Sequence, residues 1–151
     1  MSFTAPPCSS LTTFPNLSAL NNLTILVASG NKLSEIPIWL CGLPRIEEAD
    51  FSHNRTISTI PEEISGLDTL KRLNLDNNNI SAIPSSVFIE CTALQSIALH
   101  NNPITAAQVR ATYGYEEFEA RRKAKYDKVI GGGVLIGTGG FQTGLDDGKR
   151  P

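Results

Sequence analysis

The sequence predicts an α/β fold, a short solenoid with parallel strands on its concave face and helices that close its last coil. Four asparagines, Asn31, Asn54, Asn78 and Asn102, recur at intervals of 23, 24 and 24 residues. Each asparagine stands in the same frame of apolar residues, LxxLxLxxNxL, and the first three frames are followed by Ile-Pro. A frame that repeats with this period indicates stacked coils, each of which buries its apolar face against the next.

The frame predicts both a strand and a turn. In the third frame, Leu73 and Leu75 alternate with polar residues, as in a strand with one buried face. The asparagine that follows can hydrogen-bond the backbone of a tight turn, so the four asparagines are expected to form a ladder inside the coil. Strands are therefore expected near residues 24–28, 47–51, 71–75 and 95–99. Each Ile-Pro should end regular pairing, because proline has no N–H, and the return path should be irregular or briefly helical.

The domain organisation follows from these frames. A period of about 20 to 29 residues with this pattern is the leucine-rich-repeat signature. The second frame is looser than the others and carries one extra residue near Arg55 and Thr56. We expect an N-terminal segment and half repeat over residues 1–22, four repeats over 23–104, capping helices over 105–130 and a glycine-rich tail over 131–151. A chain of 151 residues with 40% hydrophobic content is long enough to bury one core.

The N-terminal end begins in mid-repeat. Residues 11–15, Leu-Thr-Thr-Phe-Pro, match the second half of a unit. Residues 1–10 contain Pro6-Pro7 and are expected to be too few and too proline-rich to supply a full preceding strand. The strand near residues 24–28 would then be an edge, covered either by residues 1–8 of the chain itself or by a partner.

The C-terminal end is expected to close with two helices. Thr105 with Gln108 resembles a capping box, and Gly114 breaks the run that follows. Beyond the glycine, residues recur at helical spacing: Tyr115, Phe118, Arg122, Tyr126 and Val129.

Charges on the second of these helices allow two interpretations. The pairs Glu117–Arg121 and Glu119–Lys123 are spaced i,i+4 and favour a solvated helix. The alternative is a basic patch that meets RNA, anionic lipid or an acidic protein tail.

Together, IPxxLxxL units and a following GYxxFExRRKxKYDK helix resemble the small intracellular leucine-rich-repeat proteins related to the plant Ras-group set and their animal counterparts. The resemblance covers about residues 11–104 for the repeats and 114–130 for the helix. It implies a cytosolic adaptor without catalytic residues.

The tail holds eight of the twelve glycines and is expected to be flexible on its own. Alternatively, Val134-Leu135-Ile136 and Phe141 dock along a neighbouring protein as an extended peptide. A phosphate loop is not expected, because the lysine of GxxxxGK[ST] is missing.

Charge, hydropathy and cysteine use limit the functional classes. The net charge of −2 creates no field that would attract nucleic acid or a membrane surface, and no segment reaches the roughly 18 apolar residues of a membrane span. The first ten residues lack the basic and apolar regions of a signal peptide. Cys91 falls at a core position, and Cys8 and Cys41 offer no obvious pair, which suits a reducing compartment. We therefore expect a cytoplasmic protein.

Neither histidine indicates an enzyme. His53 and His100 follow strands, lack an accompanying serine or cysteine nucleophile, and have no metal-ligand spacing. We interpret both as polar turn residues and expect no cofactor, metal or small-molecule substrate.

The variable strand positions are candidate partner contacts on the concave face. The candidates are Ile25, Val27, Glu48, Asp50, Arg72, Asp76 and His100. Acidic residues of the second unit face basic residues of the third, Glu47 opposite Lys71 and Glu48 opposite Arg72. These residues either neutralise each other as exposed cross-strand pairs or form a bipolar surface that selects a partner.

A second candidate contact follows the first Ile-Pro. There the first unit places Ile38-Trp39, whereas the second and third place Glu62-Glu63 and Ser85-Ser86. Tryptophan is enriched among residues that dominate binding energy. The side chain of Trp39 is expected either to contact a partner or to pack on the N-terminal segment, for example on Leu17.

The function predicted from these features is that of a non-catalytic adaptor or structural subunit of a larger intracellular assembly. The alternative is a signalling regulator that binds a small GTPase or a phosphatase through the concave face.

Overall fold

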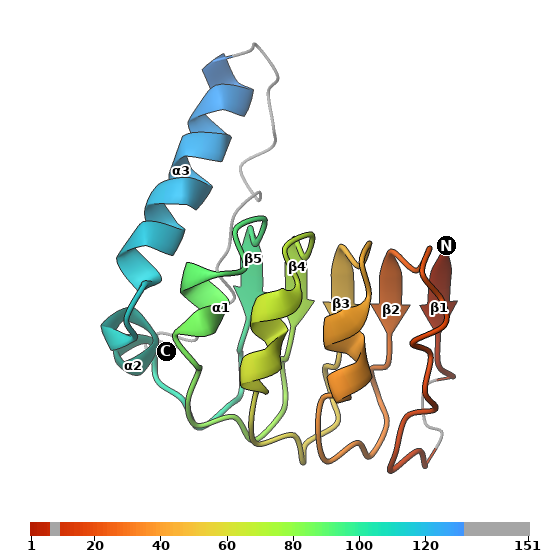
Figure 1. The fold of residues 1–151 in the computed structure, drawn as a ribbon. Helices are drawn as coiled ribbons and strands as arrows, with labels where there is room; N and C mark the ends of the chain where they lie inside the picture. The colour runs from red at the N-terminus through yellow and green to blue at the C-terminus, as the bar shows by residue number, and fades with distance from the viewer. Residues whose placement is uncertain (7–9, 132–151) are drawn as a thin grey trace.

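The structure, a computed structural model, describes residues 1–6 and 10–131, with side chains to residue 128. Its strands form one parallel sheet in the order β1-β2-β3-β4-β5, with each strand beside its neighbour in the sequence (Figure 1). The strands are β1 Ser2–Thr4, β2 Ile25–Val27, β3 Glu48–Asp50, β4 Arg72–Asn74 and β5 Ser96–Ala98. The α/β solenoid is therefore confirmed, and the last four strands lie inside the four ranges expected from the frame.

Strand β1 corrects one expectation. Phe3 is in register with Leu26, and the Ala5 N–H donates to the carbonyl of Val27 at 2.8 Å. The prediction that residues 1–10 are too few for a preceding strand was wrong, because each strand of this coil needs only three residues. The chain itself, rather than a partner, thus covers the edge of β2.

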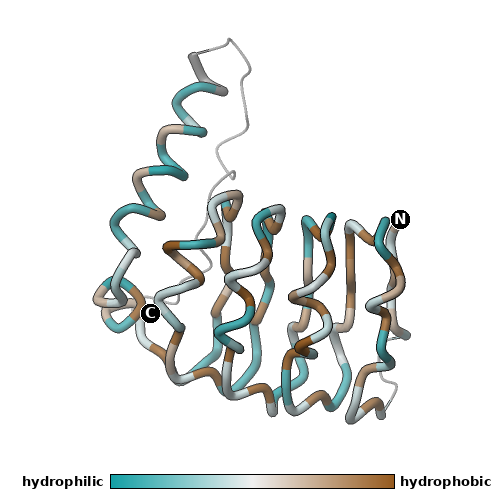
Figure 2. Tube along the Cα trace, viewed as in Figure 1, coloured by the Kyte–Doolittle hydropathy of each residue, from teal (hydrophilic) through white to brown (hydrophobic). Residues whose placement is uncertain are grey.

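Short helices follow the Ile-Pro pairs on the other side of each coil. They are η1 Ile38–Gly42, η2 Glu62–Gly66 and α1 Ser86–Ile89. Pro37 and Pro61 stand at the N-caps of the first two, where the missing proline N–H costs no hydrogen bond. Leucines, isoleucines and phenylalanines of the frame fill the space between strands and helices, and apolar segments recur from coil to coil (Figure 2).

Asn54, Asn78 and Asn102 each link their coil to the one before it. Asn54 Nδ2 donates to the carbonyl of Phe51 at 2.8 Å and to that of Ala28, one coil earlier, at 3.2 Å. Its Oδ1 accepts the backbone N–H of Leu33 at 3.0 Å. Asn78 and Asn102 repeat the donation to their own and the preceding coil. The stack therefore satisfies backbone groups that lie between strands, where water does not reach.

A left-handed residue precedes every ladder asparagine. These residues are Gly30, His53, Asn77 and Asn101, with φ between 56° and 71°. Glycine adopts this region freely, and asparagine and histidine are enriched there, so the chain places suitable residues at all four turns.

The extra residue of the second coil is absorbed at Arg55, which also has a positive φ, 65°. In the first and third coils the residue two places after the asparagine donates its N–H to the next ladder side chain, as Leu33 and Ile80 do. Asn78 Oδ1 is buried and has no hydrogen-bond partner among the described residues. We attribute this missing hydrogen bond to the extra residue in the second coil.

Two helices close the C-terminal end. Helix α2 spans Ala106–Ala111, and its capping box of Thr105 and Gln108 is confirmed. Gly114, with φ 89°, separates α2 from α3, Tyr115–Gly131. Phe118 is fully buried, 5.1 Å from the ring of Phe88 on α1.

Beyond its first turns, α3 projects away from the coil (Figure 1). The expected pairs Glu117–Arg121 and Glu119–Lys123 are not the ones observed. Arg121 donates instead to the backbone carbonyl of Phe88, and Glu119 lies 3.5 Å from Arg122. For Arg121, packing against α1 thus overrides local spacing, whereas Glu119 pairs locally at i,i+3.

Some expectations fall outside the described residues. They concern Cys8, the side chain of Val129, and the tail segments Val134-Leu135-Ile136 and Phe141. Among the described helices, none is long and apolar enough to cross a membrane.

Candidate protein-interaction surfaces

An open groove of about 310 Å³ crosses the sheet from β2 to β5. Alternate residues of each strand point into the core, so the residues between them form this face. The side chains that line it from the variable positions are Ile25, Val27, Glu48, Asp50, Arg72, Asn74, Ser96 and Ala98. Five of the predicted concave contacts, Ile25, Val27, Glu48, Asp50 and Arg72, therefore lie on one surface.

Two ion pairs cross the middle of this face. Lys71 Nζ lies 2.9 Å from Glu47 Oε2, and Arg72 pairs with Glu48. Their side chains are largely solvated, so each pair is worth less than about 1 kcal/mol. Of the two interpretations of these charges, the structure shows the one in which they neutralise each other as cross-strand pairs.

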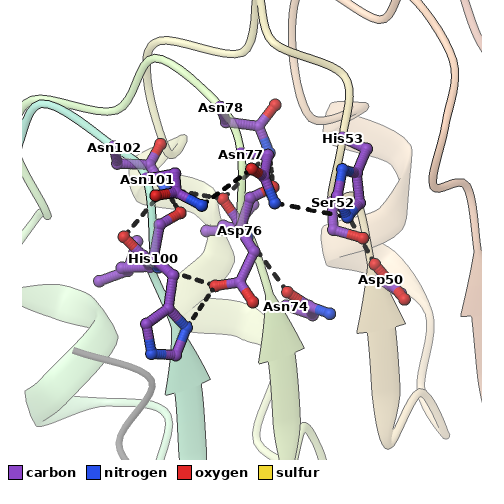
Figure 3. A network of polar contacts seen from close by, with 12 residues as sticks. Asp50, Ser52, His53, Asn74, Asp76, Asn77, Asn78, His100, Asn101 and Asn102 are labelled. Atoms are coloured by element: carbon purple, nitrogen blue, oxygen red, sulfur yellow. Dashed lines mark hydrogen bonds and ion pairs between the residues drawn. The ribbon is translucent and has the colours of Figure 1, made fainter. Parts of the chain in front are cut away.

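A polar network lies where the strands end (Figure 3). Asp50 Oδ1 accepts the Ser52 N–H at 2.9 Å. Asp76 Oδ1 accepts the backbone N–H of His100 at 2.7 Å and lies 3.1 Å from His100 Nδ1. Asp76 and His100, which do not line the groove, thus connect the third coil to the fourth at its rim.

A second row of side chains runs along the left-handed turns, beside the buried ladder. Asn101 Nδ2 donates to Asn77 Oδ1 at 3.0 Å, and Asn77 Nδ2 lies 3.3 Å from His53 Nε2 (Figure 3). Sequence reasoning missed this row, although the residue preceding each ladder asparagine was the available signal. Within the described chain, no group of three or more His, Cys, Asp or Glu residues could hold a metal ion.

A separate groove of about 240 Å³ lies beside η1 and the N-terminal segment. Ile38 on its rim is 62% exposed. Trp39 is half-buried, and its ring lies 5.9 Å from that of Phe14, which in turn meets Phe3 edge-on at 5.8 Å. Trp39 thus packs on Phe14 of the N-terminal segment and still lines the groove.

The two described cysteines are free thiols. Cys91 is fully buried, as its core position predicted, and its Sγ donates to the carbonyl of Ile64 at 3.3 Å. Burial raises the pKa of the Cys91 thiol to about 11, and burial, followed by the charge of Glu63, raises the pKa of Cys41 to about 11. Both are protonated at neutral pH and are poor nucleophiles.

Comparison with known proteins agrees with this coil. The leucine-rich-repeat family matches residues 22–43 and 50–104, together about half of the chain. A rice protein described as plant intracellular Ras-group-related LRR protein 7 is 44% identical over 57 residues, which are 38% of this chain and 22% of that protein. Toll-like receptor 6 of cattle is 31% identical over 90 residues, 60% of this chain and 11% of the receptor.

A solved structure has the same fold. A leucine-rich-repeat protein of Leptospira interrogans superposes with a TM-score of 0.62 at 30% identity, over 69% of this chain and 27% of that one. The chain thus spans between about a tenth and about a quarter of the length of these three proteins. The repeated frame, the asparagine ladder and these matches show that the chain belongs to the leucine-rich-repeat family and resembles its plant Ras-group-related members.

Proposed function

We propose that this chain is a non-catalytic protein–protein interaction module that acts as an adaptor or structural subunit of a larger intracellular assembly. Leucine-rich repeats generally bind other proteins, because stacked coils create an extended concave surface. One observation carries the adaptor role. Two grooves with no lining residue in common lie on a single stack of coils.

The concave groove is the first proposed contact. Its backbone is fixed by the asparagine ladder, so a partner meets a preorganised surface and little ordering is needed on binding. The contact residues we propose there and at its rim are Ile25, Val27, Glu48, Asp50, Arg72, Asp76 and His100.

The groove beside η1 is the second proposed contact surface. Ile38 is an apolar residue that is 62% exposed, whereas the residues at the equivalent positions of the next two coils are polar. Trp39 and Phe14 form the apolar floor beside it. We propose that Ile38 and Trp39 contact a different partner from the one at the sheet.

We also propose a cytoplasmic location. The rice relative is described as intracellular. The two described cysteines are free thiols, which suits a reducing compartment.

Affinity purification followed by quantitative mass spectrometry tests the adaptor role. Val27→Asp alters the sheet groove, and Ile38→Asp alters the groove at η1. Ser81→Asp is the control, because Ser81 is exposed and lines neither groove. An adaptor should lose different proteins with each of the first two variants and none with the control. If the two variants retain every protein that the unchanged chain captures, the proposal fails.

A signalling regulator that binds a small GTPase or a phosphatase through the concave face is the second candidate. It is favoured by the description of the rice relative as Ras-group-related. In that case only Val27→Asp should release the partner, and capture should depend on the nucleotide added to the lysate or on phosphatase activity.

A further inference from the structure

The concave face has an uneven charge distribution, because its basic residues are already engaged. Lys71 and Arg72, on the third coil, pair with Glu47 and Glu48 on the second. These four charges cancel locally. Any remaining charge on the face must come from other residues.

That remainder is negative. Asp50 is in register with Val27 on one side and Asn74 on the other, so it faces no cation across the sheet. Among the basic side chains that the structure describes, Asp76 contacts only His100. In the part of the chain that the structure describes, neither carboxylate has a lysine or arginine partner, and both lie at the same ends of neighbouring strands (Figure 3).

The backbone contacts of these aspartates also hold their side chains in place. Asp50 Oδ1 accepts the Ser52 N–H, and Asp76 Oδ1 accepts the His100 N–H. One oxygen of each carboxylate is therefore fixed by the turn, which reduces the entropy lost when a cation binds the group.

Aliphatic surface lies directly beside this charge. Val27 and Ile25 on β2 are half-buried and line the same groove as Asp50. Neighbouring strands are about 4.8 Å apart. Adjacent side chains of one bound segment can therefore reach Val27 and Asp50 together.

We infer that the concave groove binds a protein segment in which a lysine or arginine stands next to an aliphatic residue. The cation meets Asp50 and Asp76, and the aliphatic side chain covers Ile25 and Val27. This inference rests on the proposed function and specifies the chemistry of its partner. An acidic segment or a nucleic acid would bring negative charge toward the two carboxylates and is disfavoured.

Two labelled peptides measure this preference directly. One alternates lysine and leucine, the other glutamate and leucine, and both are read by fluorescence anisotropy against the full chain. We expect the lysine peptide to bind at least about tenfold more tightly, with an affinity that falls as salt is raised.

Variants then locate the contact. Asp50→Asn and Asp76→Asn keep the oxygen that accepts the backbone N–H and remove the charge, and each should weaken the lysine peptide about fivefold. Asp68→Asn makes the same change of net charge at an exposed position outside the groove and should leave binding unchanged. Equal affinities for the two peptides, or equal effects of Asp50→Asn and Asp68→Asn, would overturn the inference.

Capture of natural partners by the variants distinguishes a failure of this inference from a failure of the proposed function on which it rests. If a protein is lost with Val27→Asp but retained by both aspartate variants, the groove binds a partner and the cationic preference is wrong. If Val27→Asp releases nothing, the interaction role of the groove itself fails. Thermal unfolding of each variant shows whether the fold is intact before these results are compared.

Discussion

The backbone N–H of Leu33 donates to Oδ1 of Asn54 at 3.0 Å, so a side chain of the second coil completes the turn of the first. The same side chain donates to carbonyl groups of both coils. Asn54 therefore serves four backbone groups in the interior, whereas Asn78 lacks a described partner for its Oδ1.

This difference predicts unequal costs for the two substitutions. Asn54→Ala should lower the free energy of unfolding by about 3 kcal/mol, because it leaves buried carbonyls and one N–H unsatisfied. Asn78→Ala should cost about 1 kcal/mol less, since no N–H loses an acceptor. Urea denaturation followed by circular dichroism measures both values, and equal losses would contradict the assignment.

Gly114 joins the two C-terminal helices with φ 89°, and a Cβ placed there would lie 2.6 Å from Ile89 Cγ1. Gly114→Ala should destabilise the protein by about 2 kcal/mol, through left-handed backbone strain and the displacement of Ile89. Gly42→Ala is the matched control, because a Cβ added at Gly42 would have open space within 4 Å. It should leave the thermal midpoint unchanged or slightly raised.

Trp39 and Ile38 are neighbours that are expected to contribute very differently to the free energy of unfolding. Trp39→Ala should cost about 2 kcal/mol, because its half-buried ring packs on Phe14. Ile38→Ala should change the free energy of unfolding by less than about 0.5 kcal/mol, since the side chain is 62% exposed. Chemical denaturation of the purified variants compares the two directly. A larger loss for Ile38→Ala would mean that the packing at the N-terminal end is not as described.

The two thiols predict a loss of stability in alkali. An ordinary thiol has a pKa of 9.0, and the pKa values of both Cys41 and Cys91 are raised to about 11. In the unfolded chain they release protons near pH 9, while the folded chain retains them. Their contribution is therefore fully present below about pH 9 and declines as the pH rises toward 11.

Urea midpoints at about pH 8 and about pH 10 measure this decline. Cys91→Ala should lower the midpoint at both pH values because a buried side chain is shortened, but its drop between them should be smaller than that of the unchanged chain. An identical drop would show that other groups cause the alkaline loss.

The repeat could be predicted from the sequence because the interior of the coil requires one residue type at each frame position. Asn31 and its equivalents need an amide that donates to backbone carbonyls of the coil, and Leu73 and Leu75 need one buried face, so composition and spacing expose the strands. Strand β1 was not readable in the same way. Three residues with exposed Ser2 and Thr4 carry too little pattern, and Pro6-Pro7 argued against pairing.

Contacts between distant residues were also beyond the sequence. Arg121 has Glu117 at helical spacing, yet it donates to the carbonyl of Phe88, 33 residues away. The ring of Trp39 packs on that of Phe14 because the N-terminal segment runs along the first coil, as the bond from the Lys32 N–H to the Leu11 carbonyl shows. Such choices depend on packing that no local periodicity encodes.

The left-handed conformation of Arg55 has a practical consequence. One additional residue bulges at that corner while β3 and β4 keep their register on either side. Length can therefore change there without shifting the hydrophobic stack. The corner is a suitable position for grafting an epitope or affinity loop, and such an insertion would alter the outline of the molecule while the register of β3 and β4 stays the same.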